Sequence, residues 1–391
     1  MQAKEIKVKP SEILKNVQDN LYEIWLPSWY AWFKDTQNGG FHERLDEKLK
    51  PVDLGYRRLV TQCRQLFVYS HAALTTGDLS RMDGIEEAFD YLVKYYYRPE
   101  TGGWRFSVKP DGTPVDDTYD LYGHAFLVLC CTYYYRLTQD ETVMDIARRT
   151  LDFINTAFRV EGLPGFAEAL DEDLKPLDRM RRQDPHMHLF EASLFMYRVT
   201  NNKPYLSLAK ELADLFTDKF WSRESGTLPE YYDDFLNPHP ESGHISQPGH
   251  HFQWIWLLEK FQETRRRKHQ NLFDIMSELF VWADKHGFDP AYGGIYDELD
   301  IQGDILTDSK RIWPIMEALK AYPVINRLEN DPHYCTRRAE DLVTLLRAHY
   351  LEEDGRWTEQ LSRDMKPLRT DMPGTTPYHI YLGIAALSEI E

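Results

Sequence analysis

Gly102-Gly103-Trp104 forms a glycine turn that is followed by an aromatic side chain, and turns of this kind recur along the chain. The others are Gly39-Gly40-Phe41, Pro164-Gly165-Phe166, Gly226-Thr227-Leu228, Gly293-Gly294-Ile295 and Gly355-Arg356-Trp357. Measured between the glycines at positions 40, 103, 165, 226, 294 and 355, the intervals are 63, 62, 61, 68 and 61 residues. Repeats of this length indicate a repeat architecture, and six units account for nearly all of the 391 residues.

Each unit contains two segments with apolar residues at helical spacing. In the first unit, Leu14, Val17 and Leu21 mark one helix, and a second helix begins near Arg57. The later pairs are expected at residues 82–97 with 119–137, 141–158 with 184–200, 204–220 with 249–264, 268–286 with 308–323, and 333–350 with 376–389. The sequence therefore predicts twelve helices in six pairs.

The connections between these helices alternate in length. Each glycine turn lies in a long loop inside a pair, whereas the links between pairs, such as residues 138–140 and 201–203, are short and favour antiparallel neighbours. Six pairs stack as an open solenoid or close into a toroid, and six is the number that closes. We therefore predict an all-α (α/α)6 barrel, a single domain over residues 1–391, with the more apolar second helices inside. Alternating stretches in the long loops, such as residues 40–45, predict short β-hairpins.

The composition is that of a soluble globular protein, with 42% hydrophobic and 28% charged residues. A formal net charge of −17 disfavours binding to nucleic acid or to anionic membranes. The N-terminal stretch lacks the apolar core of a signal peptide, and no segment has the length of a membrane span. The four cysteines, Cys63, Cys130, Cys131 and Cys335, form no CxxC motif, so we expect a cytoplasmic protein without disulfides.

Polar residues recur near the start of the second helix of the units. They are Arg64, His124, His188, His250, Glu317 and His379, which lie 24, 21, 23, 24, 23 and 24 residues after the glycine of their own unit. Trp313 lies one helical turn before Glu317. Because equivalent positions of a pseudo-symmetric repeat occupy one level of the barrel, we predict that these side chains share a pocket on its axis. For any one histidine on an apolar helix, a structural role in the core is the competing interpretation.

The predicted set suits proton transfer next to a carbonyl group. Histidine takes up and returns protons near neutral pH, and arginine stabilises an oxyanion without titrating. Removal of the proton at C2 of an open-chain aldose gives an enediolate, which yields a ketose or the 2-epimer according to where the proton returns. A metal site is the rival interpretation, since His186 precedes His188 by two residues and His251 follows His250. Neither helical pair can direct both rings at one ion, so we expect no metal and no other cofactor.

Seven segments give the sequence a resemblance to the N-acylglucosamine 2-epimerase superfamily over essentially the whole chain. They are Asn38-Gly-Gly-Phe41, Thr61-Gln-Cys-Arg-Gln65, Leu121-Tyr-Gly-His-Ala-Phe126, Asp184-Pro-His-Met-His-Leu-Phe-Glu-Ala192, Pro248-Gly-His-His-Phe-Gln-Trp254, Arg311-Ile-Trp-Pro314 with Glu317, and Thr376-Pro-Tyr-His379. The superfamily includes cellobiose 2-epimerases, mannose 2-epimerases and aldose–ketose isomerases that act on mannose. Each segment is weak alone, but their order is specific. The resemblance implies an (α/α)6 barrel, in agreement with the repeat.

The resemblance also implies roles for individual residues. His379 would be the general base at C2, and His250 would be its partner acid or would assist ring opening. His188 would hydrogen-bond the reacting oxygens, and Arg64 would stabilise the enediolate. Trp313 would face the sugar. His124, Glu191, Gln253 and Glu317 complete the expected substrate-binding set, with Glu191 placed behind His188 rather than acting as an acid or base.

One position departs from the pattern of the superfamily. Many members carry Glu three residues after the first His of Pro-Gly-His, where this chain has Gln253. A Glu would orient His250 and raise its pKa, whereas Gln adds no charge. This departure weakens a two-base epimerase more than a one-base isomerase that relies on His379.

The resemblance is stronger to the mannose isomerase branch than to the cellobiose branch, so we expect interconversion of D-mannose and D-fructose. The alternatives are a 2-epimerase acting on mannose or glucose, N-acylglucosamine or cellobiose, an (α/α)6 glycoside hydrolase, and a non-catalytic sugar-binding protein. A hydrolase needs two carboxylates at the scissile bond, and Glu317 is the lone acid among the six equivalent positions of the repeat. The expected partner is a small sugar, and the protein is expected to be a monomer or a homodimer.

Overall fold

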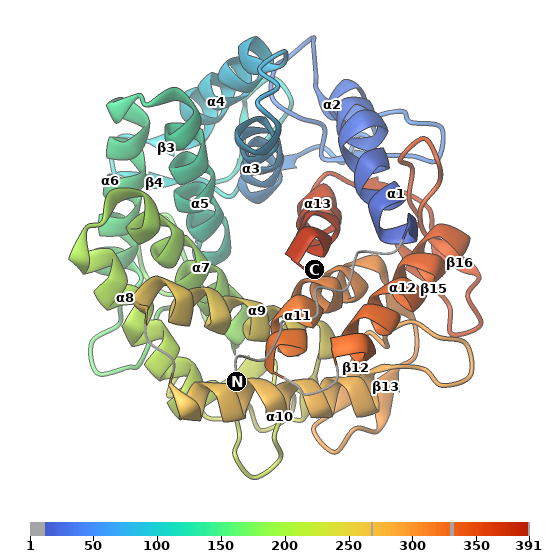
Figure 1. Ribbon diagram of the computed structural model, residues 1–391. Helices are drawn as coiled ribbons and strands as arrows, with labels where there is room; N and C mark the ends of the chain where they lie inside the picture. Colours follow the sequence, from blue (N-terminus) through green and yellow to red (C-terminus); the bar gives the residue numbers. More distant parts are fainter. Residues whose placement is uncertain (1–11, 267–268, 329–331, 390–391) are drawn as a thin grey trace.

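The computed structural model describes residues 12–266, 269–328 and 332–389, so the ends of the predicted domain 1–391 lie outside the described residues. Within the described part, helices form two concentric rings (Figure 1). The inner ring consists of α3 (Leu59–Thr76), α5 (Leu121–Thr138), α7 (Gln183–Thr200), α9 (Pro248–Arg265), α11 (Ile312–Leu328) and α13 (Pro377–Ala385), which the 3-10 turn η3 (Ala386–Glu389) extends. The outer ring consists of α1 (Glu12–Asn20) with η1 (Leu21–Trp25) and α2 (Leu26–Phe33), α4 (Met82–Tyr96), α6 (Glu141–Ala157), α8 (Lys203–Leu215) with η2 (Phe216–Phe220), α10 (Gln270–Gly287) and α12 (Pro332–His349).

The apolar patterns explain which helix lies in which ring. Helix α6 carries one stripe of buried residues, among them Val143, Ala147, Leu151 and Ile154, and exposes its other face, as an outer helix should. Helix α5 is buried on all sides from Gly123 to Tyr134. The prediction that the second helix of each pair is the inner one is therefore confirmed.

The inner ring is closed. Each inner helix packs against the next from α3 to α13, and α13 packs back against α3. Segments at opposite ends of the sequence therefore lie side by side, with α1 next to α12 and α13 (Figure 1). The predicted (α/α)6 barrel is confirmed, and the open solenoid is excluded.

The strands are short and lie in the long loops. They are β1 (Arg44–Leu45), β2 (Arg57–Arg58), β3 (Tyr97–Arg98), β4 (Gly103–Trp104), β5 (Ser107–Val108), β6 (Pro114–Asp116), β7 (Tyr119–Asp120), β8 (Ala169–Leu170), β9 (Arg181–Arg182), β10 (Tyr231–Tyr232), β11 (Ile245–Ser246), β12 (Glu298–Asp300), β13 (Ile305–Thr307), β14 (Lys310–Arg311), β15 (Gln360–Leu361), β16 (Pro367–Arg369) and β17 (Met372–Pro373). The pairs β5–β6, β12–β13 and β15–β16 are hairpins inside one loop, as predicted.

Other strand pairs connect neighbouring units. This pairing between units was not predicted from the sequence. Strand β2 pairs with β5, β7 with β8, β9 with β10, β11 with β12, and β14 with β15, all antiparallel. Strand β1 pairs with β17, so that the first and last units are joined in the same way. The loops therefore form a second closed ring at the end of the barrel where the inner helices begin.

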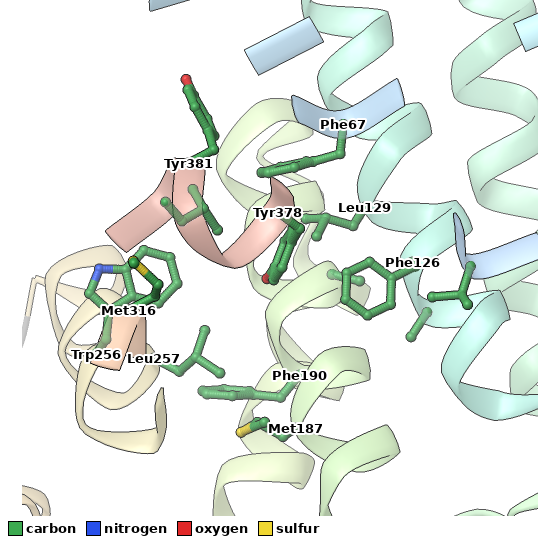
Figure 2. Packing of buried hydrophobic residues seen from close by; sticks show 14 of the residues in the cluster. Phe67, Phe126, Leu129, Met187, Phe190, Trp256, Leu257, Met316, Tyr378 and Tyr381 are labelled. Carbon is green, nitrogen blue, oxygen red and sulfur yellow. The ribbon is translucent and has the colours of Figure 1, made fainter. Parts of the chain in front are cut away.

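Aromatic side chains fill the barrel beneath this loop ring. Tyr378 projects from α13 towards Phe126 of α5 and Phe67 of α3, with ring centroids 5.1 and 5.4 Å away, and Phe190 of α7 lies below them (Figure 2). This layer divides the axis of the barrel into a cavity among the loops and a second cavity of about 660 Å³ towards the C-terminal ends of the inner helices. Within the described residues, no helix combines the length and apolar character needed to cross a membrane.

Candidate active site

A cavity of about 390 Å³ lies above the aromatic layer, where the inner helices begin. Every inner helix contributes a side chain to its wall. The helical lining residues are Arg64 of α3, Tyr122 of α5, Asp184 and His188 of α7, His250 and Gln253 of α9, Trp313 of α11 and His379 of α13. The strands and loops add Arg182, Glu230, Tyr231, Gln247, Glu298, Arg311, Glu359, Thr375 and Thr376.

His379 is oriented by a buried chain of charges. Its Nδ1 lies 2.7 Å from Glu317 Oε1, and the other oxygen of Glu317 lies 2.5 Å from Lys320 Nζ. On the cavity side, Arg64 Nη1 lies 3.4 Å from His379 Nε2. Because arginine can only donate, Nε2 is the acceptor and the proton of the neutral ring resides on Nδ1.

The surroundings of His379 keep its imidazole uncharged. Burial lowers the pKa of His379 to about 3, and the neighbouring Arg64 and Lys320 add to this effect, although Glu317 opposes it. Burial alone would raise the pKa of Glu317, but Lys320 and His379 bring it down to about 2. His379 is thus a neutral ring whose Nε2 faces the cavity and accepts from Arg64, and an uncharged imidazole is the form that can take up a proton.

His250 has the opposite electrostatic environment. Its Nδ1 lies 2.9 Å from Glu230 Oε1, and its Nε2 lies 3.8 Å from Asp184 Oδ1. Burial by itself would lower the pKa of His250, but the two carboxylates outweigh burial and raise it above the usual value. His250 is therefore suited to carry a proton and to donate it.

His188 and Asp184 connect the two sides of the cavity. Asp184 Oδ1 lies 3.4 Å from His188 Nε2, on the same carboxylate that approaches His250. Glu191 Oε2 lies 2.9 Å from His188 Nδ1, and the hydroxyl of Tyr378 donates to both oxygens of Glu191. These contacts fix the orientation of the His188 ring.

Arg64 is held in an aromatic cage. Its guanidinium carbon lies 4.3 Å from the ring centroid of Phe126, 4.9 Å from that of Tyr378 and 5.3 Å from that of Tyr122. Arg64 also donates hydrogen bonds to the Tyr122 hydroxyl and to the Thr375 carbonyl. Cation–π contacts hold a guanidinium without neutralising it, so the positive charge remains available to an oxyanion in the cavity.

Trp313 contacts both histidines. Its ring centroid is 4.8 Å from that of His250 and 5.6 Å from that of His379. A Cβ atom on Gly249 would lie 2.4 Å from this indole, so the glycine of Pro-Gly-His allows Trp313 to pack directly on the start of α9. Trp313 provides a flat apolar surface that both histidine rings contact.

Gln253 also lies in the wall of the cavity, and its side chain is almost completely buried. Neither its amide oxygen nor its amide nitrogen has a hydrogen-bond partner among the described residues. The group that orients His250 and raises its pKa is Glu230, not position 253. Gln253 adds no charge, as expected, and a carboxylate from another part of the chain lies beside His250 instead.

The structure places His124 outside the cavity, which corrects the prediction that it binds substrate. His124 is fully buried, its Nδ1 bonds the Asp120 carbonyl at 2.7 Å, and its Nε2 accepts from the Trp104 backbone N–H at 3.1 Å. His186 bonds the Arg182 carbonyl and the Phe166 N–H in the same way.

Two more residues occupy this structural position. Gln62 accepts from the Phe41 N–H at 2.8 Å, and His251 lies 2.6 Å from the Thr227 hydroxyl. The repeated residue of the units is thus the anchor of the glycine turn, and His186 rather than His188 is the equivalent of His124. Both ring nitrogens of His186 and both of His251 have hydrogen-bond partners. Neither the pair His186 and His188 nor the pair His250 and His251 can therefore bind one metal ion through both rings. Within the described residues, no cluster of three or more potential metal ligands is found.

Glu191 and Glu317 do not line the cavity, although both were expected to bind substrate. They lie behind His188 and His379 and orient them, as was anticipated for Glu191 alone. The cavity has other carboxylates, which are Asp184, Glu230, Glu298 and Glu359, so Glu317 is not the lone acid of the site.

The sequence analysis did not predict the carboxylates that line the cavity, although a sequence pattern marks two of them, Glu230 and Glu359. An acidic residue follows the glycine of five units by three or four positions, in Glu43, Glu168, Glu230, Asp297 and Glu359. Three of these acids accept from the backbone N–H and side chain of an arginine that precedes an inner helix. This pattern would have marked Glu230 as a loop acid close to the start of α9.

Comparisons with known proteins decide the family. The model of the N-acylglucosamine 2-epimerase (GlcNAc 2-epimerase) family matches residues 39–383. The chain belongs to this family. It is 29% identical over 381 residues to a mannose-6-phosphate isomerase of Rhizobium meliloti (strain 1021), with 94% of this chain and 95% of that protein covered. It is 27% identical over 405 residues to a cellobiose 2-epimerase of Eubacterium cellulosolvens, with 93% and 95% covered.

A solved structure agrees with the fold. The cellobiose 2-epimerase of Bacillus thermoamylovorans B4167 superposes with a TM-score of 0.87 at 21% sequence identity, over 95% of this chain and 98% of that one. The chain is therefore a carbohydrate isomerase or epimerase. The expected resemblance, fold and class of enzyme are confirmed, whereas the sugar itself is a matter for proposal.

Proposed function

We propose that this enzyme interconverts D-mannose and D-fructose through an enediol. His379 Nε2 removes the proton from C2 of the open-chain aldose, and the electron pair of the broken C–H bond forms the C1–C2 double bond. The carbonyl oxygen O1 becomes negative, Arg64 stabilises it, and protonated His250 donates a proton to it. The hydroxyl on C2 then returns a proton to His250 while His379 delivers its proton to C1. The ketose forms with no net gain or loss of protons.

The observation that carries this proposal is the opposite perturbation of two histidines in one cavity. Burial keeps the pKa of His379 low, and two carboxylates keep the pKa of His250 high. Environments that push the pKa values of two groups apart assign one to the base and the other to the acid. Because both rings pack against Trp313, a sugar lying on that indole reaches both.

The charges in the wall favour a sugar without a phosphate group. Arg182 Nε donates to Glu168 at 2.6 Å, and Arg311 Nε donates to Asp297 at 2.9 Å, so both guanidinium groups already have a carboxylate partner. Arg64 lies deep in the cavity beside His379. A phosphate would also meet the four lining carboxylates, and like charges at close range repel. This chain therefore differs in expected substrate from the mannose-6-phosphate isomerase that it resembles.

The size of the cavity favours a monosaccharide. Ligand pockets range from about 300 to 1,000 Å³, and the volume of about 390 Å³ is near the lower end. The aromatic layer below limits extension of a sugar in that direction.

A 2-epimerase is the second candidate, and the charge state of His250 favours it. With Glu230 beside it, His250 is a second proton donor that contacts Trp313 as His379 does. Delivery of its proton to C2 of the enediolate would give the epimer instead of the ketose. The similarity to a cellobiose 2-epimerase supports the same alternative.

We further infer a cytoplasmic enzyme that acts as a monomer or a homodimer and requires no cofactor. The four cysteines are buried and free, which agrees with a reducing compartment. Proton transfer through an enediol involves no net oxidation or reduction of the sugar, so the reaction does not require a redox cofactor.

The test is proton NMR of D-mannose with the enzyme, in parallel with D-mannose 6-phosphate and cellobiose. Fructose as the first product, with at least tenfold lower turnover of the phosphate ester, is the expected result. Glucose as the first product would establish the epimerase in place of the isomerase. Faster turnover of the phosphate ester would overturn the argument from the wall charges, and inertness towards all free aldoses would contradict the proton-transfer function itself.

A further inference from the structure

In three units, the acidic residue that follows the glycine turn forms an ion pair with an arginine. Glu43 pairs with Arg58, Glu168 with Arg182 and Asp297 with Arg311, at distances of 2.5 to 2.9 Å. In each case the arginine is the residue immediately before an inner helix. The pair ties the loop of a unit to the start of its own inner helix.

Two units have the acid without the arginine. The residue before α9 is Gln247, and the residue before α13 is Thr376. In the first case the acid, Glu230, pairs with His250 and belongs to the proton-transfer machinery described above. In the second case the acid is Glu359, and no ion pair forms between it and any described residue within 4.0 Å.

Glu359 presents one oxygen to the cavity. Its Oε2 accepts from Trp357 Nε1 at 3.0 Å and from Thr376 Oγ1 at 2.8 Å, which fixes the carboxyl group. Among the described residues, none donates a hydrogen bond to Oε1, and the residue lines the cavity while only 7% exposed. Burial raises the pKa of Glu359 to about 7, although the hydrogen bonds from Trp357 and Thr376 and the charges of Arg369 and Arg311 oppose this rise.

The free oxygen of this carboxyl group is not among the fully buried polar atoms, so it is open to whatever fills the cavity. A polar group removed from water without a hydrogen bond costs free energy, and in the neighbouring units an arginine supplies that bond. In the unit of Glu359 the cavity takes the place of the arginine, and a hydroxyl group that enters the cavity can donate to the free oxygen.

We infer that Glu359 is a substrate-binding residue that accepts a hydrogen bond from a sugar hydroxyl through Oε1. Thr376, which holds the other oxygen, also accepts from the His379 backbone N–H at 3.0 Å. The bound hydroxyl is thereby held on the same side of the cavity as the base. Glu359 thus helps to select a neutral polyhydroxylated substrate and to set its position relative to His379. This inference rests on the proposed action on a free aldose.

The test compares the wild-type enzyme with Glu359→Gln, using the aldose that the wild type converts and its monodeoxy derivatives. Gln retains one oxygen for Trp357 and Thr376 but turns an amide N–H₂, a donor, towards the cavity. We expect a fall in kcat/KM of about 10- to 100-fold, mainly through KM, because a hydrogen bond to a carboxylate is lost. For one deoxy sugar, which lacks the bonded hydroxyl, the wild type and the variant should become equal within about twofold.

Two further variants keep the outcome interpretable. Glu43→Gln alters the equivalent acid of the first unit, away from the cavity, and should lower thermal stability without changing KM. Glu359→Asp withdraws the carboxylate by one methylene and should raise KM, even if Glu359→Gln does not fold. An active wild type whose KM is unchanged in both Glu359 variants would overturn this inference alone. A wild type that converts no aldose would overturn the proposed function and this inference with it.

Discussion

His379 and His250 show how two identical side chains acquire different chemistry from their neighbours. The His379 ring contacts Glu317, whose own charge is compensated by Lys320, and the positive Arg64, so burial decides the pKa of His379. His250 faces two carboxylates that outweigh burial. The assignment of base and acid follows from these contacts rather than from the histidines themselves.

Replacement of His379 by Asn should abolish proton abstraction while leaving the cavity intact. We expect kcat to fall by about 10²- to 10⁴-fold, which is the usual contribution of a general base, with KM changed by less than about fivefold. Steady-state kinetics with the natural sugar measures both constants. A variant that keeps more than a tenth of the wild-type kcat would show that another group is the base.

Replacement of Glu230 by Gln should change the pH dependence of the reaction. Protonated His250 is the active form, and it is lost as pH rises through its pKa. Without the Glu230 charge, burial lowers that pKa, so the alkaline limb of the kcat/KM profile should move to lower pH. Activity at pH 8 should therefore decrease more than activity at pH 6. A uniform decrease at both pH values would argue that Glu230 has only a structural role.

At the scale of the helix and its loop, the repeat made the fold predictable. Glycine turns and apolar spacing gave the helix pairs, their order and the inner ring, because these depend on patterns within each unit. Pairing of strands between units could not be predicted, since strands of two or three residues leave no periodic signal.

The candidate site was predicted only in part, for a geometrical reason. Counting residues from the glycine turn grouped His124, 21 residues after its glycine, with His188, 23 residues after its own, whereas His186 lies at the same interval of 21 as His124. Successive residues of a helix are rotated by 100°, so a shift of two residues moves a side chain to the opposite face. His186 and His188 occupy these two faces, the first towards the turn and the second towards the cavity.

The glycine turn itself offers a test at this scale. Gly165 has φ of 65°, and a Cβ there would lie 2.7 Å from His186 Nε2, whereas Gly226 has φ of 66° with no atom within 4 Å of its Cβ position. Both substitutions to Ala incur the left-handed strain of about 1–2 kcal/mol. Gly165→Ala should lose about 1–3 kcal/mol more, because it disturbs the hydrogen bond from Phe166 to His186. Urea unfolding of both variants measures the difference, and equal losses would contradict the anchoring role of His186.

For the molecule as a whole, the buried anchor histidines make stability depend on pH. Burial lowers the pKa of His124 and of His186 to about 4 and that of His251 to about 3. The unfolded chain binds protons to these residues below about pH 6.5, whereas the folded protein does not. Their contribution to stability is therefore complete above pH 6.5 and is lost as pH falls towards 4.

The substitution His186→Gln isolates one of these contributions, because Gln62 already performs the same anchoring in the first unit. Relative to the wild type, the variant should gain about 1.4 kcal/mol of unfolding free energy per pH unit between pH 6.5 and pH 5. Urea unfolding at several pH values provides the measurement. His349→Gln, at an exposed position, is the control and should follow the wild type. Parallel curves for His186→Gln and the wild type would refute the titration argument.

The closed ring brings the first and last units together at the site, since Arg64 of α3 and His379 of α13 lie 3.4 Å apart although 315 residues separate them.

The central claim is that this pair and His250 move the proton at C2. It is tested most directly by NMR of D-mannose in D2O, following the C2 hydrogen with the wild type, His379→Asn and His250→Asn. The wild type should give deuterium-labelled product, His250→Asn should still exchange the C2 hydrogen slowly, and His379→Asn should leave it in place. Exchange by His379→Asn at the wild-type rate would contradict the account.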